Sequence, residues 1–456
     1  MKFQKLKNIL IGGSIRTAKA KKNILASFVI KGLSILVGFL MVPMVINYLN
    51  TTNYGIWITI SSFLSWFTFF QIGLGAGLKN KLAVSFAKEN TQLAKIYVST
   101  TYAMLSIIIT IVATLFFIGN MFIDWTAVLN APKGMSEELN VLALIVFGFF
   151  FLRFVLKLIG SILLADQRPA LSNLFGPLGN LFALIIIYFL SQNSNGSLIY
   201  LGLTISTIPV VVLLIGSVIL FSGQYKEIRP SLRFVKFEYA KDLLSLGVKF
   251  FLIQISALVM FQTSNIIITQ FFGPAQVTPY SIAFKYFSVI NMLFTIIITP
   301  FWSAHTEAWV KKDYTWIKTA IRNLLYIWLG FVVMGIIMLL FSDTFFQFWI
   351  GRHNMDNIEI SYRLRYILLI YFLIFSFGGI FNMFINGVGV IKLQTISLII
   401  GTLVFIPLTY FFIKVFNFGI ESVALAMIIA NFYSLFIAPI QYKKLINNRA
   451  YGIWGK

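Results

Sequence analysis

The chain has 456 residues, of which 59% are hydrophobic and only 11% are charged, and its mean hydropathy is +0.88. This composition is far more apolar than that of an ordinary soluble domain, so it excludes a soluble protein and places most of the chain in a lipid bilayer. The chain has no cysteine and two histidines, which excludes disulfides, thiol nucleophiles and Cys-ligated metals, and we expect no cofactor.

Apolar segments of spanning length recur along the whole chain. At about 25 residues for a span and about 13 for a loop, the length predicts about twelve transmembrane helices. Hydropathy places the first six at 24–46, 54–74, 96–122, 139–165, 171–190 and 198–221. It places the other six at 243–272, 279–302, 320–341, 362–386, 391–413 and 418–441. The predicted fold class is an all-α integral membrane protein with twelve transmembrane helices.

The distribution of positive charge predicts the orientation of these helices. Lys and Arg accumulate in cytoplasmic loops. Most of the 36 Lys and Arg residues fall in the two termini and in alternate loops, and seven of them lie in residues 2–23. The opposite loops hold only Lys133, Arg352, Arg363, Arg365 and Lys414. Both termini are therefore predicted to lie in the cytoplasm, and the first apolar segment is predicted to be a retained helix rather than a cleaved signal peptide.

The longest hydrophilic segment in mid-chain divides the predicted spans into two sets of six. Two six-helix halves enter the membrane with the same orientation, because six is even. The predicted parts are a basic cytoplasmic segment at 1–23, an N-terminal bundle at 24–221, a cytoplasmic linker at 222–242, a C-terminal bundle at 243–441 and a cytoplasmic tail at 442–456.

The formal net charge of +22 also raises the question of nucleic-acid binding. The basic residues are scattered over short loops rather than gathered on one domain face, which argues against that class of partner. The N-terminal segment mixes basic and apolar residues. It is either a tail that sets the topology or a segment that lies on anionic lipid.

A cationic stripe is predicted inside the fourth span. A charge in mid-bilayer is costly and usually faces a cavity or a partner. Arg153, Lys157 and Ser161 follow one another at intervals of four residues, which places all three on one face of a helix. We expect this face to line a water-filled cavity, with Arg153 as the principal ligand group. The alternatives are that Arg153 only hydrogen-bonds to backbone carbonyls and that Lys157 extends to the interface.

Three further lysines lie inside predicted spans. Lys31 in the first helix and Lys285 in the eighth have serines at helical spacing around them, so each is predicted to line the same cavity. Both lie about 10 Å from a helix end, and extension to the interface is the alternative. Lys249 is nearer the cytoplasmic end of the seventh helix, where that alternative is favoured.

Amide side chains are the other candidate binding groups. Gln254 and Gln262 share one face of the seventh helix with Asn265 and Thr269, and Asn382 lies in the tenth helix. These groups are suited to binding sugar hydroxyls. They are equally suited to hydrogen bonds between helices, which are common in membranes.

The acidic residues show the opposite pattern. All fourteen lie in loops or near the ends of spans. Ion relays and pockets for cationic drugs usually need a buried carboxylate, whereas a hydrated cavity with an excess of positive charge attracts anions. The ligand is therefore predicted to be negatively charged.

The segment from Pro43 to Ala87 resembles the Wzx-type O-antigen flippases, which are the polysaccharide transporter branch of the MOP superfamily that also contains the MATE exporters. The resemblance is carried by the sequence YGIW at 54–57 and by QIGLGAGL at 71–78, together with the plan of twelve spans and short loops. Members of the family often carry an acidic residue at the position of Gln71, and this chain lacks that carboxylate.

The resemblance implies a V-shaped pair of six-helix bundles in the bacterial inner membrane. Such a protein moves undecaprenyl-diphosphate-linked oligosaccharide repeat units, for O-antigen, capsule or exopolysaccharide, from the cytoplasmic to the periplasmic leaflet. It implies a polysaccharide polymerase and a chain-length regulator as partners, and a role in transport rather than in catalysis. A cationic cavity in the family agrees with Lys31, Arg153, Lys157 and Lys285.

Two other classes of function remain as alternatives. A MATE-type exporter of organic cations requires a carboxylate inside the membrane, which this chain lacks. A membrane-bound glycan polymerase or ligase requires a large extracytoplasmic loop with catalytic side chains. The longest such loops, at 123–138 and 342–361, are short, and His353, Asp356 and Glu359 in the second are interpreted as solvated loop residues.

Overall fold

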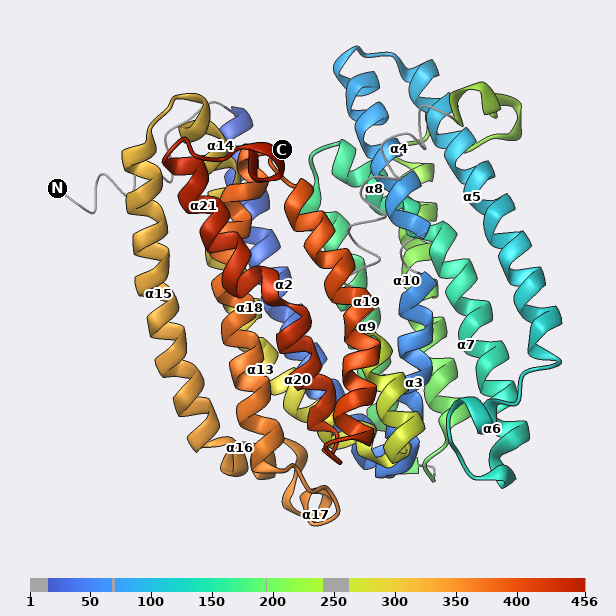
Figure 1. Ribbon diagram of the computed structural model, residues 1–456. Helices are drawn as coiled ribbons and strands as arrows, with labels where there is room; N and C mark the ends of the chain where they lie inside the picture. The colour runs from blue at the N-terminus through green and yellow to red at the C-terminus, as the bar shows by residue number, and fades with distance from the viewer. Residues whose placement is uncertain (1–14, 68–69, 194, 241–261, 456) are drawn as a thin grey trace. The chain divides into compact units, whose positions relative to one another are not determined.

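The structure is a computed structural model that describes residues 15–67, 70–193, 195–240 and 262–455. Every regular element in these residues is a helix, as the composition predicts (Figure 1). The helices form two compact units. The first unit draws on Met1–Asn50 and Phe63–Leu252, and the second on Thr51–Ser62 and Ile253–Lys456.

The first unit consists mainly of long apolar helices joined by short turns. Its long helices are α2 (Ile15–Tyr48), α4 (Phe70–Ala87), α5 (Thr91–Asn120), α7 (Ser136–Leu156), α9 (Pro169–Asn193) and α10 (Leu198–Ser222), and its short ones are α6 (Trp125–Val128) and α8 (Leu158–Ala165). α9 packs along α2, α10 packs against α7 and α9, and α4 packs against α5 and α8. Polar side chains cap the N-terminal ends of several of these helices. At the start of α5, for example, the Asn90 side chain accepts a hydrogen bond from the backbone N–H of Leu93 at 2.9 Å.

The segment after α10 is fastened to α5 and contains two short 3₁₀ turns, η2 (Leu232–Phe234) and η3 (Phe237–Tyr239). The Thr100 hydroxyl accepts a hydrogen bond from the Lys236 N–H at 3.0 Å, and the Ser99 hydroxyl accepts one from the Ser231 N–H at 3.1 Å. The Tyr97 and Tyr239 rings meet edge to face with centroids 5.4 Å apart. Up to residue 240, this segment is therefore part of the surface of the first unit.

The second unit is organised around one long central helix. Its elements are the residues of α3 (Thr51–Phe67) up to Ser62, a helical segment at 262–272, η4 (Pro274–Gln276), α13 (Val277–Ile298), α14 (Phe301–Val310), α15 (Tyr314–Leu340), α16 (Ser342–Ile350), α17 (Arg352–Met355), α18 (Tyr362–Val388), α19 (Lys392–Lys414), α20 (Glu421–Ala430), η5 (Tyr433–Ile437), α21 (Ala438–Ile446) and η6 (Gly452–Gly455). α18 contacts α13, α14, α15, α20 and α21. Phe381 and Phe384 of α18 join Phe294 and Tyr433 in one buried aromatic cluster.

The last predicted span is broken in the structure. α20 and the helix that follows it meet at an angle of 41°, and η5 between them is one π-helical turn. Asn431 lies at the break and accepts a hydrogen bond from the Ser434 hydroxyl at 2.7 Å. The polar side chain thus supports the backbone where the regular hydrogen-bond ladder is interrupted.

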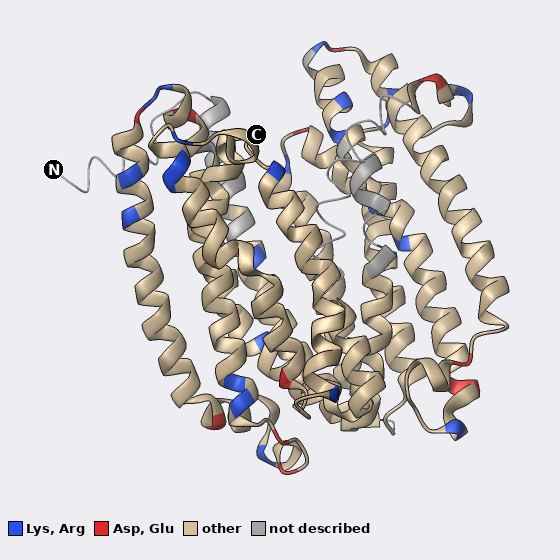
Figure 2. Cartoon of the chain, viewed as in Figure 1, with Lys and Arg blue, Asp and Glu red and all other residues tan. Residues whose placement is uncertain are grey.

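Nine helices in the described part of the chain are long and apolar enough to cross a membrane, and the bent pair makes a tenth. Their outer faces are apolar, with Leu115 of α5 and Leu329 and Val333 of α15 more than half exposed. In each unit, most charged residues lie toward helix ends and in loops (Figure 2). This is the pattern of a multi-pass membrane protein, since lipid accepts exposed apolar side chains and rejects charges.

The predicted spans and the helices do not all agree in extent. The second was predicted to end at Leu74, but α4 continues to Ala87 because Leu78 and Leu82 are buried and extend its packing beyond the apolar segment. Most of the seventh, at 243–272, lies outside the described residues.

Candidate functional site: a cationic cavity in the first unit

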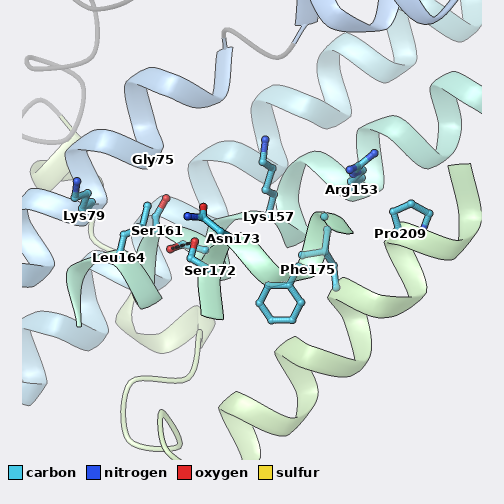
Figure 3. A pocket seen from close by; sticks show the side chains of 13 residues that line it. Gly75, Lys79, Arg153, Lys157, Ser161, Leu164, Ser172, Asn173, Phe175 and Pro209 are labelled. Atoms are coloured by element: carbon cyan, nitrogen blue, oxygen red, sulfur yellow. Dashed lines mark hydrogen bonds between the residues drawn. The ribbon is translucent and has the colours of Figure 1, made fainter. Parts of the chain in front are cut away.

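Arg153, Lys157 and Ser161 line one cavity of about 390 Å³ in the first unit (Figure 3). Arg153 lies in the last turn of α7, Lys157 is the residue between α7 and α8, and Ser161 lies in α8. The spacing of four residues therefore places these side chains on a common surface.

Three other helices complete the lining. α4 contributes Gly75 and Lys79, α8 also contributes Gly160 and Leu164, α9 contributes Ser172, Asn173, Phe175 and Gly176, and α10 contributes Pro209 and Leu213. All of these residues belong to the first unit. The site is thus built by one compact body of the protein.

Small residues bring these helices close together around the cavity. The Ser172 hydroxyl of α9 donates a hydrogen bond to the Gly160 carbonyl of α8 at 3.1 Å. A Cβ atom at Gly75 would lie 3.0 Å from the Ser161 hydroxyl oxygen, and one at Gly179 would lie 2.8 Å from Cα of Pro209. Glycine therefore permits the close contacts of α4 with α8 and of α9 with α10.

The described lining of the cavity carries positive charge without a compensating carboxylate. Lys79, Arg153 and Lys157 are the three charged residues among the described lining residues. None of the three has a hydrogen bond or an ion pair with its side chain within the described ranges. The unpaired guanidinium and ammonium groups create a field that favours an anionic ligand.

The acidic residue that follows α8 is already engaged. The Asp166 carboxylate accepts hydrogen bonds from the Tyr225 hydroxyl at 2.7 Å and from the Gln224 amide at 3.0 Å. It also forms an ion pair with Arg168 at 3.0 Å, and none of these four residues lines the cavity. Burial raises the pKa of Tyr225, which lies outside the spans, and its hydrogen bond to the Asp166 carboxylate raises it further.

The other predicted lysines do not line this cavity. Lys31 lies on α2 with an exposed side chain. Lys285 is a partly buried residue of α13 in the second unit, and the Ser288 hydroxyl donates to its carbonyl at 2.8 Å. Lys249 lies outside the described residues, as does Gln254.

The amide side chains of the second unit serve partly as contacts between helices. Asn265 donates to the Ser62 hydroxyl at 2.9 Å, and the Thr269 and Thr59 hydroxyls are 2.6 Å apart. Gln262 is partly buried in the same helical segment. Asn382 of α18 has a buried side-chain oxygen without a hydrogen-bond donor in the described part of the structure.

Lys79 is a lining residue that the sequence argument did not select. Hydropathy falls after Leu74, so Lys79 was assigned to a cytoplasmic loop. Because α4 continues past Leu74, Lys79 lies one helical turn after Gly75 on the same face. This spacing is the signal that places Lys79 beside the cavity. A single-helix pattern finds residues on one helix face but does not show which second helix meets that face.

The loop at 342–361, which the alternative catalytic interpretation concerns, contributes to a second, polar cavity of about 690 Å³. Asp356 and Glu359 line it together with Arg365, whereas His353 does not. Arg365 is held by the Ile360 carbonyl at 2.6 Å and pairs with Asp343 at 2.5 Å. Among the described residues, no group of three His, Asp or Glu side chains is arranged to hold a metal ion.

The fold is that of the MOP superfamily of transporters. The chain matches the structure of an inward-facing multidrug resistance MATE family transporter with a TM-score of 0.77, at 15% identity, over 96% of both chains. It also matches a MOP superfamily transporter from Pyrococcus furiosus, whose reported feature is reversed polarity of the binding pocket, with a TM-score of 0.62, at 15% identity, over 95% of this chain and 97% of that one. At these identities the likeness establishes the fold.

The sequence comparisons identify the family. The family described as "Polysaccharide biosynthesis protein" matches residues 20–303, and the MatE family matches residues 250–411. The chain is 23% identical to the "Putative O-antigen transporter" of Salmonella typhimurium over 87% of this chain and 90% of that one. A protein of the same name from Salmonella typhi is 23% identical over 60% of this chain and 62% of its own length. The chain belongs to the polysaccharide biosynthesis protein family, which confirms the resemblance predicted from its second helix.

Proposed function

We propose that this protein is a flippase for lipid-linked oligosaccharides. It moves undecaprenyl-diphosphate-linked repeat units of O-antigen, capsule or exopolysaccharide from the cytoplasmic to the periplasmic leaflet of a bacterial inner membrane. The observation that carries the proposal is the cavity lined by Lys79, Arg153 and Lys157, with no carboxylate among the lining residues that the structure describes. The O-antigen transporters among its relatives support the same class of substrate.

Arg153 is the proposed anchor for the diphosphate. A guanidinium group presents a planar set of donors that matches two phosphate oxygens, whereas an ammonium group acts as a point charge. Lys157, one helical turn further along, adds charge at the same place. The prenyl chain remains in the bilayer while the head group occupies the cavity, and Lys31, Lys285, Lys249, Gln254, Gln262 and Asn382 are the further candidate contacts.

The proposed transport cycle is alternating access. Twelve spans with both termini in the cytoplasm form two six-helix bundles, at 24–221 and 243–441, joined by the linker at 222–242. Rocking of these bundles exposes the bound head group first to the cytoplasm and then to the periplasm. A polymerase and a chain-length regulator then act on the delivered repeat unit.

A MATE-type exporter of organic cations is the second candidate, since the MatE family matches residues 250–411 and the fold is shared with multidrug transporters. The charge of the cavity favours the flippase, because three cations without an ion-pair partner among the described residues repel a cationic drug. Resistance to cationic drugs that depends on this protein would favour the exporter.

The test is the substitution Arg153→Gln in cells that depend on this protein for surface polysaccharide. We expect lipid-linked repeat units to accumulate in the cytoplasmic leaflet, with export reduced about ten- to a hundredfold, because a hydrogen bond to a charged group contributes about 1.5–3 kcal/mol. Arg153→Lys should keep part of the activity. Lys133→Gln in an outer loop is the control that should leave export unchanged. Normal export by Arg153→Gln at normal protein levels would refute the anchor role.

A further inference from the structure

The cationic cavity has a second polar end, at Lys79. Gly75 of α4 meets Ser161 of α8, and Lys79 follows Gly75 by one helical turn. α4 and α8 run toward the same end of the first unit (Figure 1). Ser161 is two turns beyond Arg153, so Lys79 lies about 18 Å from Arg153 along the helix direction at about 1.5 Å per residue. In Figure 3, Lys79 lies beside Leu164 and Ser161, whereas Arg153 lies toward Pro209.

This separation is too large for one diphosphate to engage both ends. A diphosphate that is esterified at both ends carries about one negative charge on each phosphoryl group, as each phosphate of a nucleic-acid backbone does. Arg153 and Lys157 are one turn apart and balance these two charges. Lys79 is then a third cation without a counter-charge among the described lining residues. Asp166, the acidic residue just beyond α8, is already held by Tyr225, Gln224 and Arg168.

The neutral lining also differs between the two ends. Phe175 of α9 and Pro209 of α10 lie toward Arg153 and present apolar surface (Figure 3). Ser161 and Asn173 belong to the other side, and within the described ranges their side chains have no hydrogen-bond partner. Hydroxyl and amide groups with free donors and acceptors are suited to sugar hydroxyls, and apolar groups are suited to the first part of the prenyl chain.

We infer that the cavity contains two anion subsites, and that the subsite at Lys79 binds a carboxylate on the sugars of the lipid-linked repeat unit. The inference rests on the proposed function and makes it more specific, because it assigns the protein to acidic rather than neutral glycans. Arg153 and Lys157 hold the diphosphate, Ser161 and Asn173 contact the sugar hydroxyls, and the Lys79 ammonium group pairs with the acidic sugar.

The experiment measures equilibrium binding of three lipids to the purified full-length protein in nanodiscs. The probes are undecaprenyl diphosphate, the same lipid with a neutral disaccharide, and the same lipid with a disaccharide that ends in a hexuronic acid. We expect the wild-type protein to bind the acidic lipid about tenfold more tightly than the neutral one. Lys79→Gln should remove this preference and leave the affinity for undecaprenyl diphosphate unchanged.

Two variants complete the comparison. Arg153→Gln should weaken the binding of all three lipids, and Lys88→Gln, in the exposed turn after α4, should retain the preference for the acidic lipid. Equal affinity of the wild-type protein for the acidic and neutral lipids would overturn the inference and leave the proposed function standing. A Lys79→Gln variant that weakens all three lipids equally would also overturn it, since Lys79 would then act on the diphosphate. Failure of all three lipids to bind would overturn both.

Discussion

His305 is a buried imidazole in an aromatic environment, in the short helix α14 that follows the span formed by α13. Its ring lies 5.6 Å from both the Trp316 and the Phe384 ring centroids and 6.0 Å from that of Phe301. Neither ring nitrogen has a hydrogen-bond partner in the described part of the chain. Burial disfavours the charged form and lowers the pKa of His305 to about 4.

The low pKa predicts a loss of stability in acid. An unfolded chain takes up this proton near pH 6.5, whereas the folded protein takes it up only near pH 4. Stability should therefore be fully present above about pH 6.5 and fall as the pH decreases toward 4. His305→Phe should reduce the difference between the Tm values measured in detergent at pH 7.5 and pH 5. The exposed His353→Asn substitution is the control that should leave this difference unchanged, and an unaltered difference in His305→Phe would contradict the assignment.

At the scale of the helices, the shape of the cavity depends directly on the contact between α9 and α10. A Cβ atom at Gly179 would lie 2.8 Å from Cα and 3.0 Å from Cβ of Pro209. Next to this contact, a Cβ at Gly216 would lie 2.2 Å from a ring carbon of Phe175. Because Pro209 and Phe175 both line the cavity, the two glycines determine how near the apolar wall lies to Arg153.

Gly179→Ala should therefore destabilise the first unit. Backbone atoms of Pro209 must move to make room, and overpacking of this kind costs about 1–3 kcal/mol. Gly176→Ala is the matched control on the same helix, because no atom lies within 4 Å of the added methyl group. Thermal unfolding in detergent should show a lower Tm for Gly179→Ala and an unchanged or slightly higher Tm for Gly176→Ala, since alanine favours helix. Equal Tm values for the two variants would show that α10 adjusts without cost.

Some of the side chains that line the cavity can be predicted from the sequence, and others cannot. Helical spacing brought Arg153, Lys157 and Ser161 together correctly because all three lie on one nearly continuous helix. Lys79 was missed because its place depends on the contact of Gly75 with Ser161, which no pattern along one helix reveals. The break at Asn431 was missed for a related reason, since hydropathy is insensitive to a change in the backbone hydrogen-bond register.

Helix ends were predicted well only where the apolar segment and the helix end together. α10 and α18 end within a few residues of the predicted spans because polar or glycine residues follow at once. α4 extends past its apolar segment because Leu78 and Leu82 remain buried by neighbouring helices. Hydropathy measures the cost of leaving lipid, whereas the helix itself continues for as long as packing supports it.

At the scale of the whole molecule, the composition argues against an acidic relay inside the membrane. The chain carries 36 Lys and Arg residues against 14 Asp and Glu residues. Glu421 is a buried acid at the start of α20, and it pairs with Arg363 at 3.3 Å. The cations that line the cationic cavity, by contrast, have no ion-pair partner within the described residues. The proposed flippase can therefore draw on the charge of its substrate rather than on a proton-binding carboxylate.

The proposed flippase should therefore respond to the membrane potential itself. Outward movement of a diphosphate with about two negative charges, from an inside-negative cytoplasm, releases about 2.3 kcal/mol per charge for each 100 mV. In proteoliposomes with uniformly oriented protein, an inside-negative potassium diffusion potential should accelerate outward flipping of undecaprenyl-diphosphate-linked disaccharide, and an inside-positive one should slow it. Valinomycin without a potassium gradient is the control, and the pH is kept equal on both sides. A flipping rate that stays the same at both polarities, with the supply of lipid held constant, would exclude this electrophoretic mechanism and point to a separate coupling ion.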